Sequence, residues 1–305
     1  MRLYIWELRK LAGDGAARAG LCVLVVFLAA ALVATSVARE RKVRLTEVIS
    51  SGVDASLMGK ANGWLFARRV LDPVCRVLVP LVVCVVLAGS MAGEVERGTL
   101  GETLVRPVPR WALVAAKLGA GATYAFALVG VAALFGLVVA PLVLGSGPMA
   151  PSASGSASTL QQMAIAAQPT GGIPPEGAKS VTIPTFTPAQ AAWRLVLAHV
   201  VAALTLAPVA ALAVAASTAC SRTGTATAVA GGVYFGLLAL ASLPGLEGVR
   251  PYLIVTRLNA WTAFMSMDIG WGALVADAVI LAVTLCLLSG ASILMLGGKE
   301  LSPHR

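Results

Sequence analysis

The sequence contains few charged residues and few aromatic residues. Asp, Glu, Lys and Arg make up 12% of the 305 residues, whereas a soluble globular domain carries about 25%. Together with a mean hydropathy of +0.86, this composition excludes an ordinary soluble domain and favours a protein of the lipid bilayer. Aromatic residues account for only 6%, so Ala, Val, Leu and Gly supply most of the apolar mass. Small residues let helices approach each other closely in lipid.

Several functional motifs are also missing. The five cysteines include no CxxC pair and no cluster with histidine, which argues against a disulfide framework or a metal site. No GxxxxGK[ST] phosphate loop occurs, so we expect no cofactor on this chain and any ATP hydrolysis on another polypeptide. The formal charge of +9 lies on no basic soluble face or tail. It therefore indicates contact with lipid head groups rather than with nucleic acid.

Long apolar stretches predict an all-α integral membrane protein that forms a single transmembrane domain over residues 1–305. Six spans are expected, at 19–38, 71–93, 111–144, 193–216, 226–243 and 271–296. The third is too long for one crossing and should project or break near Pro141, and Pro208 predicts a kink in the fourth. Trp111, Trp193 and Trp271 stand at predicted span ends, as interfacial anchors do.

The segments outside the spans carry three further predictions. Residues 1–18 have apolar side chains in an i, i+3, i+4, i+7 pattern from which Glu7 departs, which predicts a helix lying in the membrane interface. Residues 145–190 are rich in Ser, Gly, Pro and Ala and should form a flexible extramembrane loop. Residues 251–267 are moderately apolar and could form an interfacial or re-entrant helix. A cleaved signal peptide is the alternative interpretation of the first span.

The connection between the second and third spans is the most informative segment. Gly98 can end the second helix in a left-handed cap, and Thr99 with Glu102 has the spacing of a capping box that opens a new helix. Leu100 and Leu104 would share one face of that helix, which prolines close. The segment therefore predicts a short extramembrane helix suited to docking a partner, and an ordinary solvated loop is the alternative.

This connection resembles the signature of the type-2 ABC export permeases. The similar residues are Gly93, Glu94, Glu96, Arg97, Gly98, Thr99, Leu100, Leu104, Pro107, Arg110 and Lys117. The run Glu7-Leu8-Arg9-Lys10 resembles the N-terminal segment of the same family, and 244–261 resembles the stretch before its last helix. Thr103 and Pro109 depart from the pattern, which has leucine and serine there.

The resemblance implies a six-helix permease subunit of an exporter in the bacterial cytoplasmic membrane, with both termini cytoplasmic. Lys and Arg divide equally between the two sides, so charge alone gives no orientation. The connection would be the coupling helix that contacts a cytoplasmic ABC ATPase, which would bind ATP and Mg. A second permease copy or a paralogue would complete the transporter. The expected coupling residues are Glu94, Glu96, Arg97, Gly98, Thr99, Leu100, Glu102, Leu104, Arg106, Pro107 and Arg110.

A few polar or small residues within the spans remain to be placed. Asp72 and Arg76 are four residues apart and could form an ion pair. Together with His199 and Asp277, they are predicted to lie at the same depth in the membrane. They would be interfacial anchors, the polar lining of an outer cavity, or a proton-coupling site. Gly232 and Gly236 form a GxxxG motif, for which we expect packing within the chain, with a permease dimer contact as the alternative.

An ion-coupled secondary transporter is the second functional hypothesis, although the middles of the spans lack charge. A membrane enzyme is the third.

Overall fold

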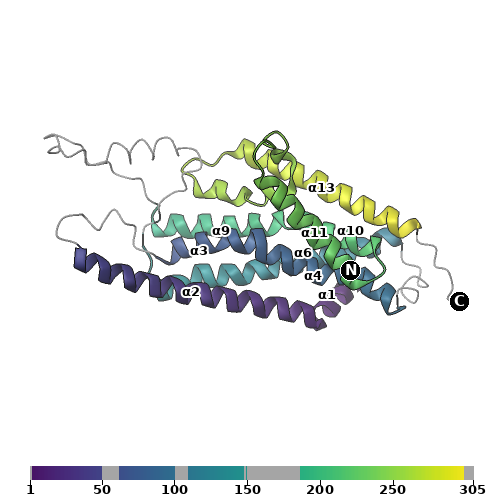
Figure 1. Cartoon of the computed structure of the whole chain (residues 1–305), viewed down its shortest axis with the longest axis horizontal. Helices are drawn as coiled ribbons and strands as arrows, with labels where there is room; N and C mark the ends of the chain where they lie inside the picture. The colour runs from purple at the N-terminus through teal and green to yellow at the C-terminus, as the bar shows by residue number, and fades with distance from the viewer. Residues whose placement is uncertain (1, 50–61, 100–108, 148, 150–185, 299–305) are drawn as a thin grey trace.

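Figure 1 shows the computed structural model, in which helices lie side by side in an elongated bundle. It describes residues 2–49, 62–99, 109–147, 149 and 186–298. Within these ranges the regular elements are helical, apart from one isolated antiparallel bridge between Met149 and Phe186. The helices are, in chain order, α1 (Arg2–Gly13), α2 (Gly15–Ile49), α3 (Gly63–Pro73), η1 (Val74–Leu78), α4 (Val79–Glu96), α6 (Arg110–Leu134), η2 (Phe135–Val139), α7 (Ala140–Leu144), α9 (Pro188–Thr205), α10 (Ala207–Ala219), α11 (Thr223–Ser242), η3 (Arg250–Tyr252), α12 (Ile254–Arg257), η4 (Ala260–Met265) and α13 (Trp271–Gly298).

Among the described residues, six helical stretches are long and apolar enough to cross a membrane, which confirms the predicted number of spans. They are Gly15–Ala38, Gly63–Glu96, Arg110–Leu144, Pro188–Ala219, Thr223–Ser242 and Trp271–Gly297. The second begins at Gly63 rather than at 71, because helical hydrogen bonding continues through the arginines at 68 and 69, where a hydropathy reading stops. The fourth begins at Pro188, where Thr187 and Gln190 form a capping box that the sequence analysis overlooked.

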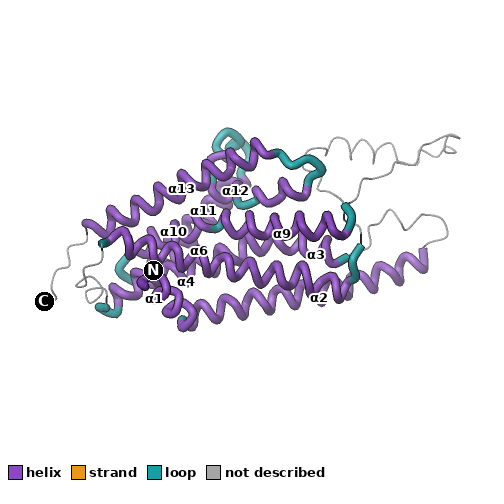
Figure 2. The backbone as a smooth tube through the Cα atoms, turned by 180° about the vertical axis from the view of Figure 1, so that it is seen from behind, coloured by secondary structure: helices purple, strands orange, loops and turns teal. Residues whose placement is uncertain are grey.

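Proline shapes the second span, which runs from α3 through the π-helical turn η1 into α4 (Figure 2). Pro80 has no N–H group, so it gives the carbonyl of Arg76, four residues earlier, no α-helical hydrogen bond. The phenol of Tyr234, on α11, donates to that carbonyl at 2.6 Å, and its side chain is 1% exposed. In lipid such a carbonyl needs a partner, so Tyr234 both satisfies η1 and fixes α11 against the second span.

The third and fourth spans are also interrupted near their prolines. In the third, the π-helical turn η2 precedes Pro141, and the helix continues through α7 to Leu144. Gly63 lies so close to the start of α7 that a Cβ atom there would be 2.3 Å from the Pro141 backbone nitrogen. In the fourth, α9 ends at Thr205 and α10 begins at Ala207. The break therefore lies just before Pro208, as the predicted kink requires.

The centre of the bundle is made of small residues. α10 packs against α4, α6, α11 and α13, and most of its alanines and valines are buried. Ser217 of α10 is fully buried, and its hydroxyl accepts hydrogen bonds from the backbone N–H groups of Met91 and Ala92 at 2.8 and 2.9 Å. This short side chain permits the close approach of two spans, in the manner that small residues allow in lipid.

The expected packing of the GxxxG motif within the chain is wrong. Gly232 and Gly236 lie on an exposed face of α11, and a Cβ atom added at either position would meet nothing within 4 Å. The opposite face of α11, with Ala226, Ala230 and Tyr234, makes the intrachain contacts. The glycine face is therefore open on this chain.

Short helices close one end of the bundle, where the sequence predicted an interfacial or re-entrant helix over 251–267. Instead η3, α12 and η4 follow one another, and η4 packs on α9 with Trp261 and Phe264 buried. Arg194 of α9 donates to the carbonyls of Phe264 at 3.1 Å and Met267 at 3.2 Å, and also to that of Ser266. The isolated bridge brings together the described ends of the loop predicted at 145–190, most of which lies outside the described residues.

Candidate functional site

The N-terminal helix docks at the end of the bundle that also holds the termini of α4 and α6. α1 packs against α6, and the Tyr4 hydroxyl lies 2.7 Å from that of Thr123. The sequence placed Glu7 off the apolar stripe, yet Glu7 is the buried residue of α1, while Trp6 is 48% exposed. The reason is a charged partner inside the bundle, which an apolar pattern does not reveal.

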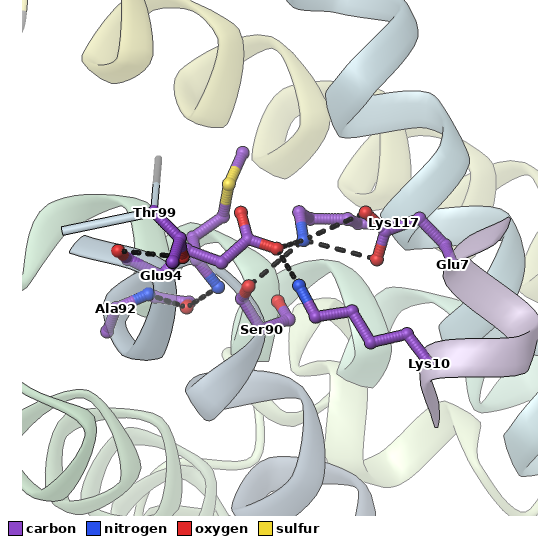
Figure 3. Close-up of polar contacts among 9 residues, drawn as sticks. Glu7, Lys10, Ser90, Ala92, Glu94, Thr99 and Lys117 are labelled. Atoms are coloured by element: carbon purple, nitrogen blue, oxygen red, sulfur yellow. Dashed lines mark hydrogen bonds and ion pairs between the residues drawn. The ribbon is translucent and has the colours of Figure 1, made fainter. Parts of the chain in front are cut away.

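That partner is Lys117 of α6, whose ammonium group is at the centre of a cluster of charges (Figure 3). Its Nζ atom lies 2.8 Å from Oε1 of Glu94 and 3.2 Å from the carboxylate of Glu7. It also donates to the carbonyl oxygen of Ser90 at 3.0 Å. Lys10 forms a second ion pair with Glu94. We call Glu7, Lys10, Glu94 and Lys117 the charge cluster.

The charges of the cluster are balanced, and its centre is buried. It contains two carboxylates and two ammonium groups, and the side chains of Lys117 and Glu94 are each 1% exposed. Taking such charges out of water costs several kcal/mol per ion, which only close pairing offsets. Removal of one member therefore leaves a buried charge uncompensated. The cluster holds α1, α4 and α6 in one relative arrangement.

The charge cluster unites two of the segments that carried the family resemblance, the N-terminal run and the connection with its following lysine. Glu7 and Lys10 belong to the N-terminal run, Glu94 to the connection, and Lys117 to the following lysine position. The sequence pattern predicted that Glu94 faces a partner protein. In the structure this carboxylate instead forms ion pairs with lysines of the same chain. Spacing alone could not bring together side chains that are up to 110 residues apart.

The end of α4 has the geometry expected from its glycine. Gly98 adopts a positive φ of 72°, which a residue without Cβ tolerates. The N–H of Thr99 donates to the carbonyl of Glu94 at 2.9 Å, and that of Gly98 donates to Val95 at 3.0 Å. These bonds form a Schellman cap, so the predicted left-handed cap is confirmed. The predicted coupling helix, with Leu100, Glu102, Leu104, Arg106 and Pro107, lies outside the described residues.

Two of the remaining charged residues beside the connection, Glu96 and Arg110, contact other spans. Glu96 accepts hydrogen bonds from the backbone N–H and the hydroxyl of Thr223 at 3.0 and 2.9 Å, so it caps the start of α11. Arg110 donates to the carbonyl of Gly297, near the end of α13, at 2.7 Å. The guanidinium of Arg97 lies beside Gly93. Both flanks of the connection are thereby fixed to the rest of the bundle.

The four polar residues predicted for an outer cavity do not share one site. Asp72 lines a cavity of about 440 Å³ between α3 and η4. His199 is buried, with Nδ1 2.7 Å from the carbonyl oxygen of Leu195, and Asp277 forms an ion pair with Arg257 of α12. Arg76 makes no ion pair with Asp72 among the described residues, because the π-helical turn that begins at Val74 interrupts the regular i, i+4 spacing.

Sequence reasoning missed several residues that fix the bundle. Tyr234, Ser217, Arg194 and Arg257 all bond to groups on other helices. Only the carbonyl left by Pro80 gave a readable signal that a donor was needed. Among the described residues, no group of three or more His, Cys, Asp or Glu side chains could hold a metal ion.

No known protein-family model matches the chain, and no curated protein matches it either. What the helices themselves support is a structural class. Within the described residues the chain is all-helical and carries six candidate spans. The protein is a multi-pass helical membrane protein.

Proposed function

We propose that this chain is the permease subunit of an ATP-driven exporter of the ABC-2 type, in the bacterial cytoplasmic membrane. It would move a substrate that the sequence does not identify, and ATP and Mg would bind a separate ATPase chain. One observation carries the proposal. The charge cluster joins the N-terminal run to the connection and to Lys117, all of which carry the family resemblance, at the end of the bundle where the connection leaves α4 and enters α6.

A connection that is bonded to several helices in this way can transmit a displacement to several spans at once. On one side Glu94 is held by Lys117 at 2.8 Å, and on the other Arg110 holds Gly297 at 2.7 Å. Glu96 adds a bond to the start of α11. Force applied to residues 100–108 by an ATPase therefore reaches the second, third, fifth and sixth spans and α1 together. Coordinated rocking of spans is what alternating access requires.

The same contacts support the proposal that both termini are cytoplasmic. α1 and the end of α13 are bound to the flanks of the connection by Glu7 and Arg110, so all three lie at one end of the bundle (Figure 1). An ATPase that docks on the connection would meet α1 at the same surface. The open face at Gly232 and Gly236 is where a second permease chain would pack, because close helix contact in lipid favours glycine.

The proposal is tested with a photocrosslinking amino acid at position 104 of the full chain in its native membrane. We expect crosslinks to a cytoplasmic chain that contains a phosphate loop, and ATP hydrolysis by the complex purified with it. Arg106→Glu should weaken both, whereas Glu96 is left intact because it caps α11. A crosslinker at the exposed Val249, near the other end, is the matched control.

Two results would refute the proposal. One is labelling of position 104 by an impermeant reagent from outside the cell. The other is transport by the purified chain alone, driven by an ion gradient, which would favour the secondary transporter instead.

A further inference from the structure

The cavity between α3 and η4 combines positive charge with apolar walls. It measures about 440 Å³ and is lined by Leu65, Arg68, Arg69, Asp72, Trp261, Thr262 and Met265. Two guanidinium groups and one carboxylate leave a net positive charge of one on the lining. It lies near the end of the bundle opposite α1, where α3 begins and η4 packs on α9 (Figure 1).

The lining offers hydrogen-bond donors. Trp261 is 3% exposed, and its indole N–H, which can only donate, has no partner among the described residues. Arg69 is exposed and forms no described ion pair. Thr262 already donates its hydroxyl proton to the carbonyl of Asn259 at 2.7 Å. The indole nitrogen of Trp261 has almost no accessible surface, so the exposed guanidinium group of Arg69 is the donor that a ligand with acceptor oxygens can reach.

The walls of the cavity are held in place before any ligand arrives. η4 is fixed to α9 by hydrogen bonds from Arg194 to the carbonyl of Phe264, within η4, and to that of Met267, just after it. On the opposite wall, α3 is capped at its start by the Asn62 side chain, which accepts from the N–H of Leu65 at 2.9 Å. Two fixed walls cut the ordering cost of binding.

We propose that this cavity binds the phosphate group of an anionic amphiphile, with the glycerol or acyl portion against Leu65 and Met265. Guanidinium groups pair with phosphate oxygens through paired hydrogen bonds. A zwitterionic lipid fits less well, because its cationic group would meet the arginines. The inference concerns the opposite end from the charge cluster and does not depend on the proposed transport function.

The test measures binding of short-chain phosphatidylglycerol to the purified full chain by native mass spectrometry, with phosphatidylcholine as the comparison lipid. Arg69→Gln should weaken phosphatidylglycerol binding roughly tenfold, the value of a hydrogen bond to a charged group. Asp72→Asn should strengthen it roughly fivefold by removing a like charge. A gain in affinity cannot arise from misfolding. Arg9→Gln, which removes a positive charge from exposed α1, should change nothing.

Inorganic phosphate distinguishes the two sources of the phosphate group. If phosphate alone displaces phosphatidylglycerol, the cavity is an anion site open to solvent. If it does not, the apolar part of the lipid is required, and the cavity is a headgroup site. Equal binding of both lipids, or unchanged affinity in Arg69→Gln and Asp72→Asn, would overturn the proposal.

Discussion

Replacement of Lys117 by methionine tests whether the charge cluster holds the bundle together. Methionine keeps most of the length of the side chain and removes the ammonium group, so Glu94 would keep only Lys10 and Glu7 would lose its ion pair. Lys10 pairs with Glu94 but its side chain is 37% exposed, so it compensates only part of the lost charge. The predicted consequence is a folded but less stable protein.

The magnitude follows from the geometry. At 2.8 Å, the attraction between Lys117 and Glu94 is on the order of 6 kcal/mol with an effective dielectric constant of about 20. Desolvation offsets much of this in the intact cluster, but removal of one buried partner costs about 3–5 kcal/mol. Because Lys10 remains, we expect about 3 kcal/mol, which corresponds to a melting temperature lower by roughly 6–12 °C.

The assay is the melting temperature of the full chain in detergent, followed by tryptophan fluorescence. Arg9→Met, which removes a charge from the exposed face of the same N-terminal helix, is the matched control and should melt like the wild type. Adding Glu7→Gln to Lys117→Met should recover part of the loss, because Glu94 keeps its ion pair with Lys10 whereas the carboxylate of Glu7 is left uncompensated. An unchanged melting temperature in Lys117→Met, or additive losses in the double variant, would refute the role of the cluster.

Two further substitutions test the packing of the spans. Gly63→Ala should cost roughly 3 kcal/mol, because its Cβ would lie 2.3 Å from the Pro141 backbone nitrogen, whereas Gly130→Ala, which meets nothing within 4 Å, should be neutral in the same melting assay. Tyr234→Phe removes the donor to a carbonyl that proline left without a helical partner, and should lower stability by about 1–2 kcal/mol. Tyr252→Phe, on a side chain 73% exposed, is its control, and equal melting of the two tyrosine variants would contradict the argument.

The sequence by itself determined the class of the protein and the number of its spans. Apolar runs of about 20 residues have few alternatives to a helix in lipid, because each backbone group must find its partner within the segment. Local rules also held where they depend on neighbours in the chain. Gly98 ends α4 with a positive φ because the residues it must bond lie within five positions, and α9 gives way to α10 just before Pro208.

Only the tertiary structure decided which polar residues meet. Glu94 and Glu96 are two residues apart, yet one is buried against Lys117 and the other caps α11 at the protein surface. The GxxxG face turned outward because Tyr234, on the other side of α11, has a carbonyl to satisfy. The physical reason is common to these cases. The free energy of a charge or donor in a membrane protein depends on partners from distant segments, and periodicity along the chain carries no information about them.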